Sequence, residues 1–444
     1  MKIITFVNFN FFYIYIILYV VSLILNDFLF GQNYYDLFEE LKFFNSDIQK
    51  VFNTHYFFHQ IIFHLFTTLF AILLLFIKNK FFSIKNGEST FSKYKIKLIY
   101  NNPEEEVKSK ISFKFYILTI VIMIIEEQFL DKIFFYLFPN VDFWMIELII
   151  VSYISSKMFN CKIYKHQKFG LYMNAVFPLI LKIITIIIIN DNNKYLLLGL
   201  IIYLILIILR SFINSKIKYY MDLKYIYEEK ILILYGLLGT IIFLVYSIIT
   251  TFISFQIEGY EKNECKSYSN ESMFLENITQ YFQIYSCEEF VKNIVTELLL
   301  ELGFIITGSI LHFFKKYFSL LVIKYLTPVH IIFSFPLYYM YDKWFLMIYH
   351  FIIKKKSFKR KITDELIKFC LDLFGDIISI VCYMVYLEIL EFHCCKLDYN
   401  IKKNIIKRSI IDAQNIDNTI NSEDFKEIEE EINKDLNISN NLLN

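Results

Sequence analysis

The chain has 444 residues, a formal net charge of +1, a mean hydropathy of +0.46 and 56% hydrophobic residues. It is more apolar than a typical soluble domain, which contains about 45–50% apolar residues. The near-zero net charge excludes a nucleic-acid-binding protein that relies on overall basicity.

The apolar residues fall in blocks of roughly twenty, the length that an α-helix needs to cross a bilayer. In chain order these blocks are residues 3–30, 56–77, 111–138, 141–153, 169–189, 195–213, 231–255, 297–324, 328–353 and 366–390. They predict an all-α, polytopic membrane protein with about ten transmembrane helices within residues 1–392. The polar residues 393–444 predict a partly disordered cytosolic tail.

The long polar loop 256–290 predicts the orientation of the chain in the membrane. It holds two glycosylation sequons, at Asn270 and Asn277, and two cysteines, Cys265 and Cys287. Glycosylation and a disulfide between these cysteines both belong to an oxidising, lumenal compartment. The Lys-rich loop 78–110 then lies in the cytosol, as the positive-inside rule requires, and so does the N-terminus.

Two registers are open after residue 291. In the first, the eighth and ninth helices are residues 297–324 and 328–353, and the tail returns to the cytosol. In the second, a hairpin at Pro336 divides residues 318–353 and gives eleven helices. We favour ten helices, although that register places the basic segment 354–361 on the lumenal side.

Charged side chains inside spans are candidates for function, because each costs about 2.5–3.5 kcal/mol to insert. Glu126 and Glu127 lie midway along the third span, and Lys182 lies in the fifth. Lys315 and Lys316 lie well inside the eighth span in the ten-helix register, whereas in the eleven-helix register they lie in an ordinary cytosolic turn. The structural alternatives are a helix kink or a water-filled cleft for the glutamates, and snorkelling for Lys182.

The eight histidines do not form the clusters that bind two irons, and the seven cysteines show no zinc-ligand spacing. No nucleophile, phosphate-binding or dinucleotide-binding motif occurs. We therefore expect no metal, no cofactor and no enzymatic activity. The enzymatic alternative is a membrane-embedded lipid-modifying enzyme, such as an acyltransferase that uses His312.

Three segments carry a resemblance to a known family. Residues 218–239, KYYMDLKYIYEEKILILYGLLG, end in a Tyr-Gly-x-x-Gly step that contains Gly236 and Gly239. The others are residues 318–332, FSLLVIKYLTPVHII, and residues 386–391, YLEILE. Together they resemble the drug/metabolite transporter superfamily, in its nucleotide-sugar-transporter-like branch.

The resemblance implies two inverted five-helix repeats around a cavity that opens alternately to the two sides. It implies close helix packing at Gly236 and Gly239, a helix junction at Pro328, and a cavity-facing position near Lys316. We expect a transporter of the endomembrane system, in the ER or Golgi rather than the plasma membrane.

The predicted function is alternating-access exchange of a phosphorylated or other anionic small solute. Lys315 and Lys316 are the expected anion contacts, and Glu126 and Glu127 the expected proton-coupling or gating groups. Lys182 and His312 are further candidates for a role in transport. The expected partners are the lipid bilayer and the solute, with no nucleic acid. A structural membrane subunit that does not transport is the remaining alternative.

Overall fold

A computed structural model describes the helical parts of the chain. The described residues are 4–6, 13–30, 56–86, 113–130, 134, 144–159, 163–189, 196–223, 226–258, 294–352, 362–392, 399 and 404. They are almost entirely helical, which confirms the predicted all-α class.

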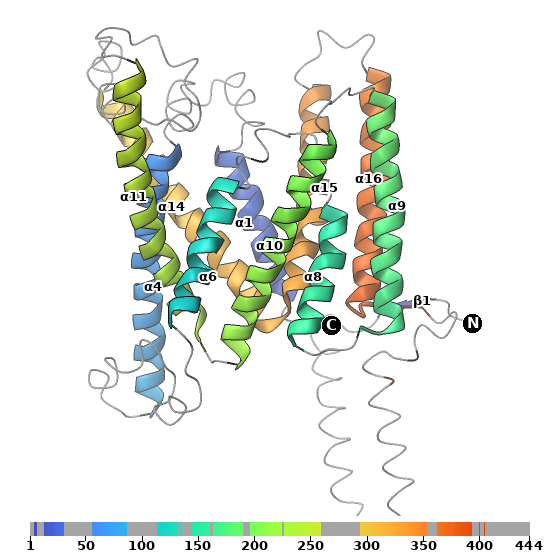
Figure 1. Ribbon diagram of the computed structural model, residues 1–444, viewed down its shortest axis with the longest axis horizontal. Helices are drawn as coiled ribbons and strands as arrows, with labels where there is room; N and C mark the ends of the chain where they lie inside the picture. Colours follow the sequence, from blue (N-terminus) through green and yellow to red (C-terminus); the bar gives the residue numbers. More distant parts are fainter. Residues whose placement is uncertain are drawn as a thin grey trace, which may run out of the picture. The chain divides into compact units, whose positions relative to one another are not determined.

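Figure 1 shows the elements in chain order. The helices are α1 (Ile14–Phe30), α4 (Tyr56–Asn86), α6 (Phe113–Ile125), the π-helix η2 (Glu126–Leu130), α8 (Trp144–Met158), α9 (Lys165–Ile189), α10 (Leu196–Leu223), α11 (Glu228–Glu258), α14 (Ile294–Tyr325), α15 (Pro328–Ile352) and α16 (Ile362–Tyr386). Each predicted stretch contains helix, because long runs of Ile, Leu and Phe favour the structure that satisfies every backbone polar group within itself in lipid.

Five helices in the described part of the chain are long and apolar enough to cross a membrane. Their spans are Phe58–Lys80, Leu198–Asp222, Glu228–Ile253, Leu302–Tyr325 and Phe369–Tyr386. Ile14–Asn26 is a shorter apolar helix. These lengths and compositions are compatible with an integral membrane protein.

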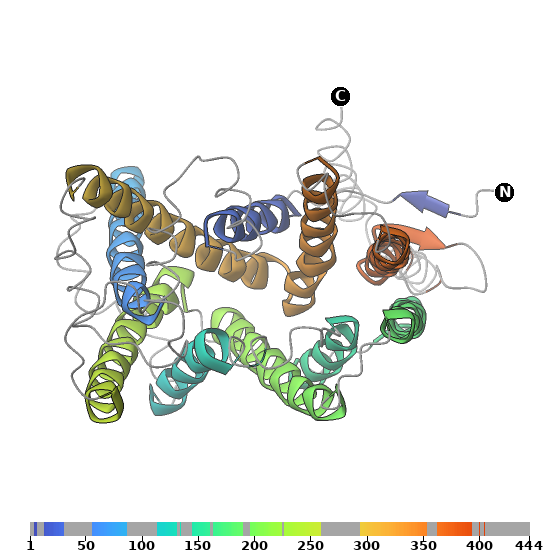
Figure 2. The same cartoon turned by 90° about the horizontal axis from the view of Figure 1, so that it is seen from above.

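The predicted ends of the first and last helices are wrong. Residues Ile4–Phe6 form strand β1, and α1 begins only at Ile14. Helix α16 ends at Tyr386, and after a left-handed residue, Glu388 with φ 61°, the chain forms strand β2 (Leu390–Phe392). β1 and β2 pair antiparallel and lie beside each other in Figure 2.

The alternative hairpin at Pro336 is also wrong. Helix α15 runs without interruption from Pro328 to Ile352 and contains Pro336 in its interior. Proline inside a membrane helix is tolerated where other groups satisfy the freed backbone.

Several predicted features lie outside the described residues. They are the sequons Asn270 and Asn277, the pair Cys265 and Cys287, and most of the tail. At the borders of the predicted loops, α4 continues to Asn86 and α11 ends at Glu258.

The helices form two compact units. The first comprises Met1–Ile17, Phe138–Ser215 and Tyr325–Asn444, and the second comprises Leu18–Leu137 and Lys216–Lys324. In the second unit the most extensive helix contact is between α4 and α11, and in the first it is between α9 and α16. Each pair is described below within its own unit.

Helices α4 and α11 pack antiparallel, since Thr68 lies against Gly236 whereas Lys78 pairs with Glu228. A Cβ at Gly236 would lie 2.7 Å from the backbone oxygen of His64 and 2.8 Å from the backbone nitrogen of Thr68. The absence of a side chain therefore allows the two backbones to approach closely, as small residues do in membrane helix pairs.

Helices α9 and α16 form a similar pair and run side by side in Figures 1 and 2. A Cβ at Gly170 would lie 2.7 Å from the backbone oxygen of Cys382, while Gly375 faces Leu181. The order of these contacts makes the pair antiparallel. His166 and Glu388 join its end by a 3.0 Å contact between Nε2 and Oε1.

Candidate functional site

The second unit contains a partly buried ion pair between helices that are far apart in the sequence. The Lys316 ammonium, on α14, donates a hydrogen bond to Oε1 of Glu127, on η2. Its side chain is 12% exposed and that of Glu127 is 28% exposed. Two residues singled out as isolated intramembrane charges thus neutralise each other.

Tyr235, on α11, holds the other oxygen of the same carboxylate. Its hydroxyl donates to Oε2 of Glu127 at 3.2 Å and accepts from Nε2 of Gln128 at 3.3 Å. The Lys316 ammonium lies 4.7 Å from the centroid of the Tyr235 ring, within cation–π range. One oxygen of the Glu127 carboxylate therefore accepts a hydrogen bond from the Lys316 ammonium, and the other accepts one from the Tyr235 hydroxyl.

Two buried histidines complete the ring of polar groups around Tyr235. The centroid of His64, on α4, is 4.8 Å from that of Tyr235 and 5.0 Å from that of His312, on α14. His312 also stacks on Phe63 at 5.9 Å. We call Glu127, Gln128, Tyr235, His64, His312 and Lys316 the central cluster.

Local sequence explains this convergence. His312 and Lys316 are four residues apart, so they lie on one face of α14. Gly239 leaves room for the His64 imidazole, which occupies the place where a Cβ would lie. The helix of α6 widens into a π-helix at Glu126 and Glu127, a local change that is frequent at functional sites.

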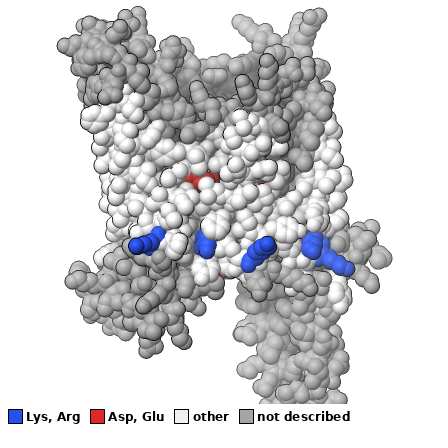
Figure 3. All heavy atoms as spheres, viewed as in Figure 1, with Lys and Arg blue, Asp and Glu red and all other residues white. Residues whose placement is uncertain are grey.

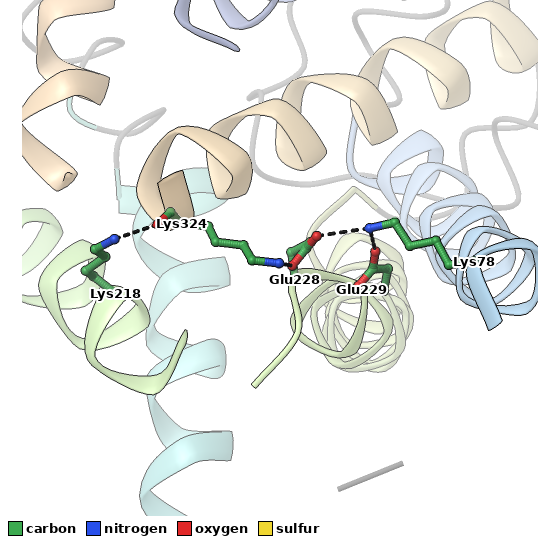
Figure 4. Close-up of polar contacts among 5 residues, drawn as sticks. All are labelled: Lys78, Lys218, Glu228, Glu229 and Lys324. Carbon is green, nitrogen blue, oxygen red and sulfur yellow. Dashed lines mark hydrogen bonds and ion pairs between the residues drawn. The ribbon is translucent and has the colours of Figure 1, made fainter. Parts of the chain in front are cut away.

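A second network ties helix ends in the same unit (Figure 4). Lys78 on α4 donates to Oε1 of Glu228 at 3.0 Å and also to Glu229, and Lys324 on α14 donates to Oε2 of Glu228. Lys218 on α10 donates to the backbone carbonyl of Lys324 at 2.6 Å. We call these five residues the end network. It brings the C-terminal ends of α4, α10 and α14 to the N-terminal end of α11.

The central cluster lies deeper along the helices than the end network. Tyr235 follows Glu228 by seven residues of α11, which is about 10 Å at 1.5 Å per residue. On the face drawn in Figure 3, Lys and Arg side chains gather near one end of the helices, and most of the remaining described surface is uncharged. Tyr235 lies within the apolar span Glu228–Ile253 and Lys316 within Leu302–Tyr325, so the ion pair is in the apolar part of these helices.

The first unit contains an ion pair between apolar helices that sequence reasoning missed. Arg210 lies midway along the apolar span Leu198–Asp222 of α10, 3.7 Å from the buried carboxylate of Glu147 on α8. Tyr383 on α16 interacts electrostatically with Glu147. The signal was present, since both charges interrupt apolar stretches as Glu127 does. Nothing in the sequence marked His64 as a site residue, and only its contacts with Tyr235 and His312 in the structure identify it.

The remaining predicted site residues lie at different places in the helices. Glu126 is buried beside Glu127, and Lys315 precedes Lys316 on α14. Lys182 lies within α9, but its side chain is outside the described residues. Pro328 is the buried first residue of α15.

No protein-family model and no curated protein matches this chain. Among the described residues, no group of three or more His, Cys, Asp or Glu side chains is arranged to hold a metal ion. What the central cluster offers chemically is a carboxylate, a cation, and several hydrogen-bonding side chains within apolar helices.

Proposed function

We propose that this protein is a membrane transporter that exchanges a small anionic solute by alternating access, with Lys316 as the anion contact. The proposal rests on one observation: Lys316 and Tyr235 each donate a hydrogen bond to a different oxygen of the Glu127 carboxylate. In this role the Glu127 carboxylate occupies the place of the solute's own oxyanion.

Electrostatics supports a competition between Glu127 and the solute for Lys316. A lone ammonium in an apolar helix bundle is costly, and either carboxylate compensates it. When Glu127 takes up a proton it loses its charge, and Lys316 is then able to hold an external anion instead. Anion binding and proton binding are coupled by this exchange.

The arrangement of helices also supports the inverted repeat of the proposal. Counted along the predicted stretches, α4 and α11 are the second and seventh helices, and α9 and α16 are the fifth and tenth. The most extensive contact in each unit therefore joins helices five places apart. Corresponding helices of two inverted five-helix repeats meet in this way when they flank a pseudo-two-fold axis.

The pairing of β1 with β2 supports an even number of crossings. Residues Ile4–Phe6 and Leu390–Phe392 are hydrogen-bonded neighbours, so they lie on the same side of any membrane that the chain crosses. Ten crossings satisfy this condition, whereas eleven do not. The end network agrees, since it puts the end of α14 beside the start of α11.

The test is counterflow in proteoliposomes that contain the full chain. Labelled phosphate, glucose 6-phosphate and succinate are supplied outside vesicles loaded with the same unlabelled anion. We expect wild-type exchange of at least one anion, and a loss of about tenfold or more in Lys316→Ala, because a hydrogen bond to a charged group contributes about 1.5–3 kcal/mol.

Lys80→Ala is the matched control, since Lys80 is an exposed lysine of α4. Its exchange rate should equal that of wild type. Equal rates for wild type and Lys316→Ala would overturn the proposal, as would wild-type rates no higher than those of empty liposomes. The second outcome would favour the structural-subunit or enzymatic alternatives.

A further inference from the structure

Two buried imidazoles of the central cluster have polar atoms that the ion pair does not use. His64 is 0% exposed and His312 is 8% exposed. Within the described residues, Nε2 of His312 makes no hydrogen bond, and neither ring nitrogen of His64 has one of ordinary geometry, although the Tyr235 backbone interacts with that ring. Leaving a buried polar group unsatisfied costs about 1–3 kcal/mol, and such groups are rare in folded proteins.

Both imidazoles adjoin the anion contact. His312 lies one helical turn before Lys316 on α14, and its ring stacks at 6.3 Å from the ring of Tyr235. His64, on α4, contacts the rings of Tyr235 and Phe243, and its own ring centroid is 5.0 Å from that of His312. Aromatic side chains contact both rings, Phe63 and Tyr235 for His312 and Tyr235 and Phe243 for His64.

Resting on the proposed function, we propose that His64 and His312 are further contacts of the transported solute, and that each donates one N–H to its oxyanion group. An uncharged imidazole carries one N–H donor, and Lys316 and Tyr235 supply two more donor groups. The site thus takes a solute with a phosphate or carboxylate group, whose oxygens accept several hydrogen bonds.

A metal site at the same place is less well supported. Two imidazoles without a third ligand do not form a metal-binding group in the described part of the chain. The ammonium groups of Lys315 and Lys316 also act electrostatically on His312, which disfavours a cation there. An anion gains from the same charges.

The test separates donation by the imidazole from its packing. His312→Phe keeps the ring stack on Phe63 and removes the N–H, whereas His312→Gln keeps an N–H donor. In the counterflow assay, His312→Phe and His64→Phe should each raise the KM for the exchanged anion about tenfold, with the maximal rate within twofold of wild type. His312→Gln should keep KM within threefold.

His330→Phe is the control, because His330 is an equally buried histidine in the first unit whose Nδ1 is 2.7 Å from the Thr327 hydroxyl. It should leave KM unchanged. Comparison of the KM changes for phosphate and for succinate shows whether the imidazole donors bind a phosphate or a carboxylate group. If wild type exchanges an anion and both Phe variants keep its KM, this inference fails while the proposed function stands. If wild type exchanges none of the three, the proposed function fails first.

Discussion

At the scale of single residues, burial decides which charge pairs matter. Glu228 is 1% exposed and receives hydrogen bonds from lysines of two other helices, in the first turn of α11 where the helix dipole also favours an anion. Asp222 is 39% exposed and pairs with Lys218 one turn away on the same helix. Exposed pairs of the second kind contribute about 0–1 kcal/mol.

We therefore predict that Glu228→Gln destabilises the protein by about 1–3 kcal/mol, because it leaves Lys78 and Lys324 without their shared carboxylate. Asp222→Asn should change stability by less than about 0.5 kcal/mol. Thermal unfolding in detergent micelles measures both variants. Equal melting temperatures for the two variants would show that the end network does not hold the helix ends.

Residue-scale reasoning from the sequence found the charges but not their partners. Glu127 and Lys316 stand out as charges in apolar stretches, and Glu147 and Arg210 stand out by the same rule. The rule cannot say that Glu127 meets Lys316, because the two are 189 positions apart and their contact depends on how η2 and α14 pack. The sequence therefore predicted separate roles for Glu127 and Lys316, whereas the structure joins the two side chains in one ion pair.

At the scale of elements, glycines set the distance between paired helices. Gly236 faces the backbone of α4, so an added methyl group meets atoms that a side-chain rotation cannot move. Gly303 on α14 has open space around its Cβ direction. The sequence predicted close packing at Gly236 and Gly239, and the helix that lies against them is α4.

We predict that Gly236→Ala destabilises the protein by about 1–3 kcal/mol through overpacking. Gly303→Ala should be neutral or stabilising by up to about 1 kcal/mol, since alanine is the better helix former. Melting curves of the two variants test this difference. Comparable losses in both would argue against a close α4–α11 contact.

At the scale of the whole molecule, the β1–β2 pair makes a prediction about topology. An epitope tag placed before Met1 and one placed after Phe392 should be accessible from the same side of the membrane. Antibody labelling of intact and of permeabilised vesicles measures this. Tags on opposite sides would require an odd number of crossings and would remove the support for the inverted repeat.

The amino-acid pattern alone was sufficient to predict the all-α class and the approximate position of each helix, since about twenty consecutive apolar residues leave few other structures available in lipid. It misplaced the start of the first helix, near Ile14, and the end of the last helix, near Tyr386. Beside these helix ends, two short strands from opposite ends of the described sequence pair with each other. Such pairing, like the meeting of His64 with His312 and of Glu127 with Lys316, depends on contacts between distant segments. Local hydropathy carries no information on those contacts, because it describes each helix without its neighbours. The isolated charges of the sequence became a candidate site only when packing brought them around Tyr235.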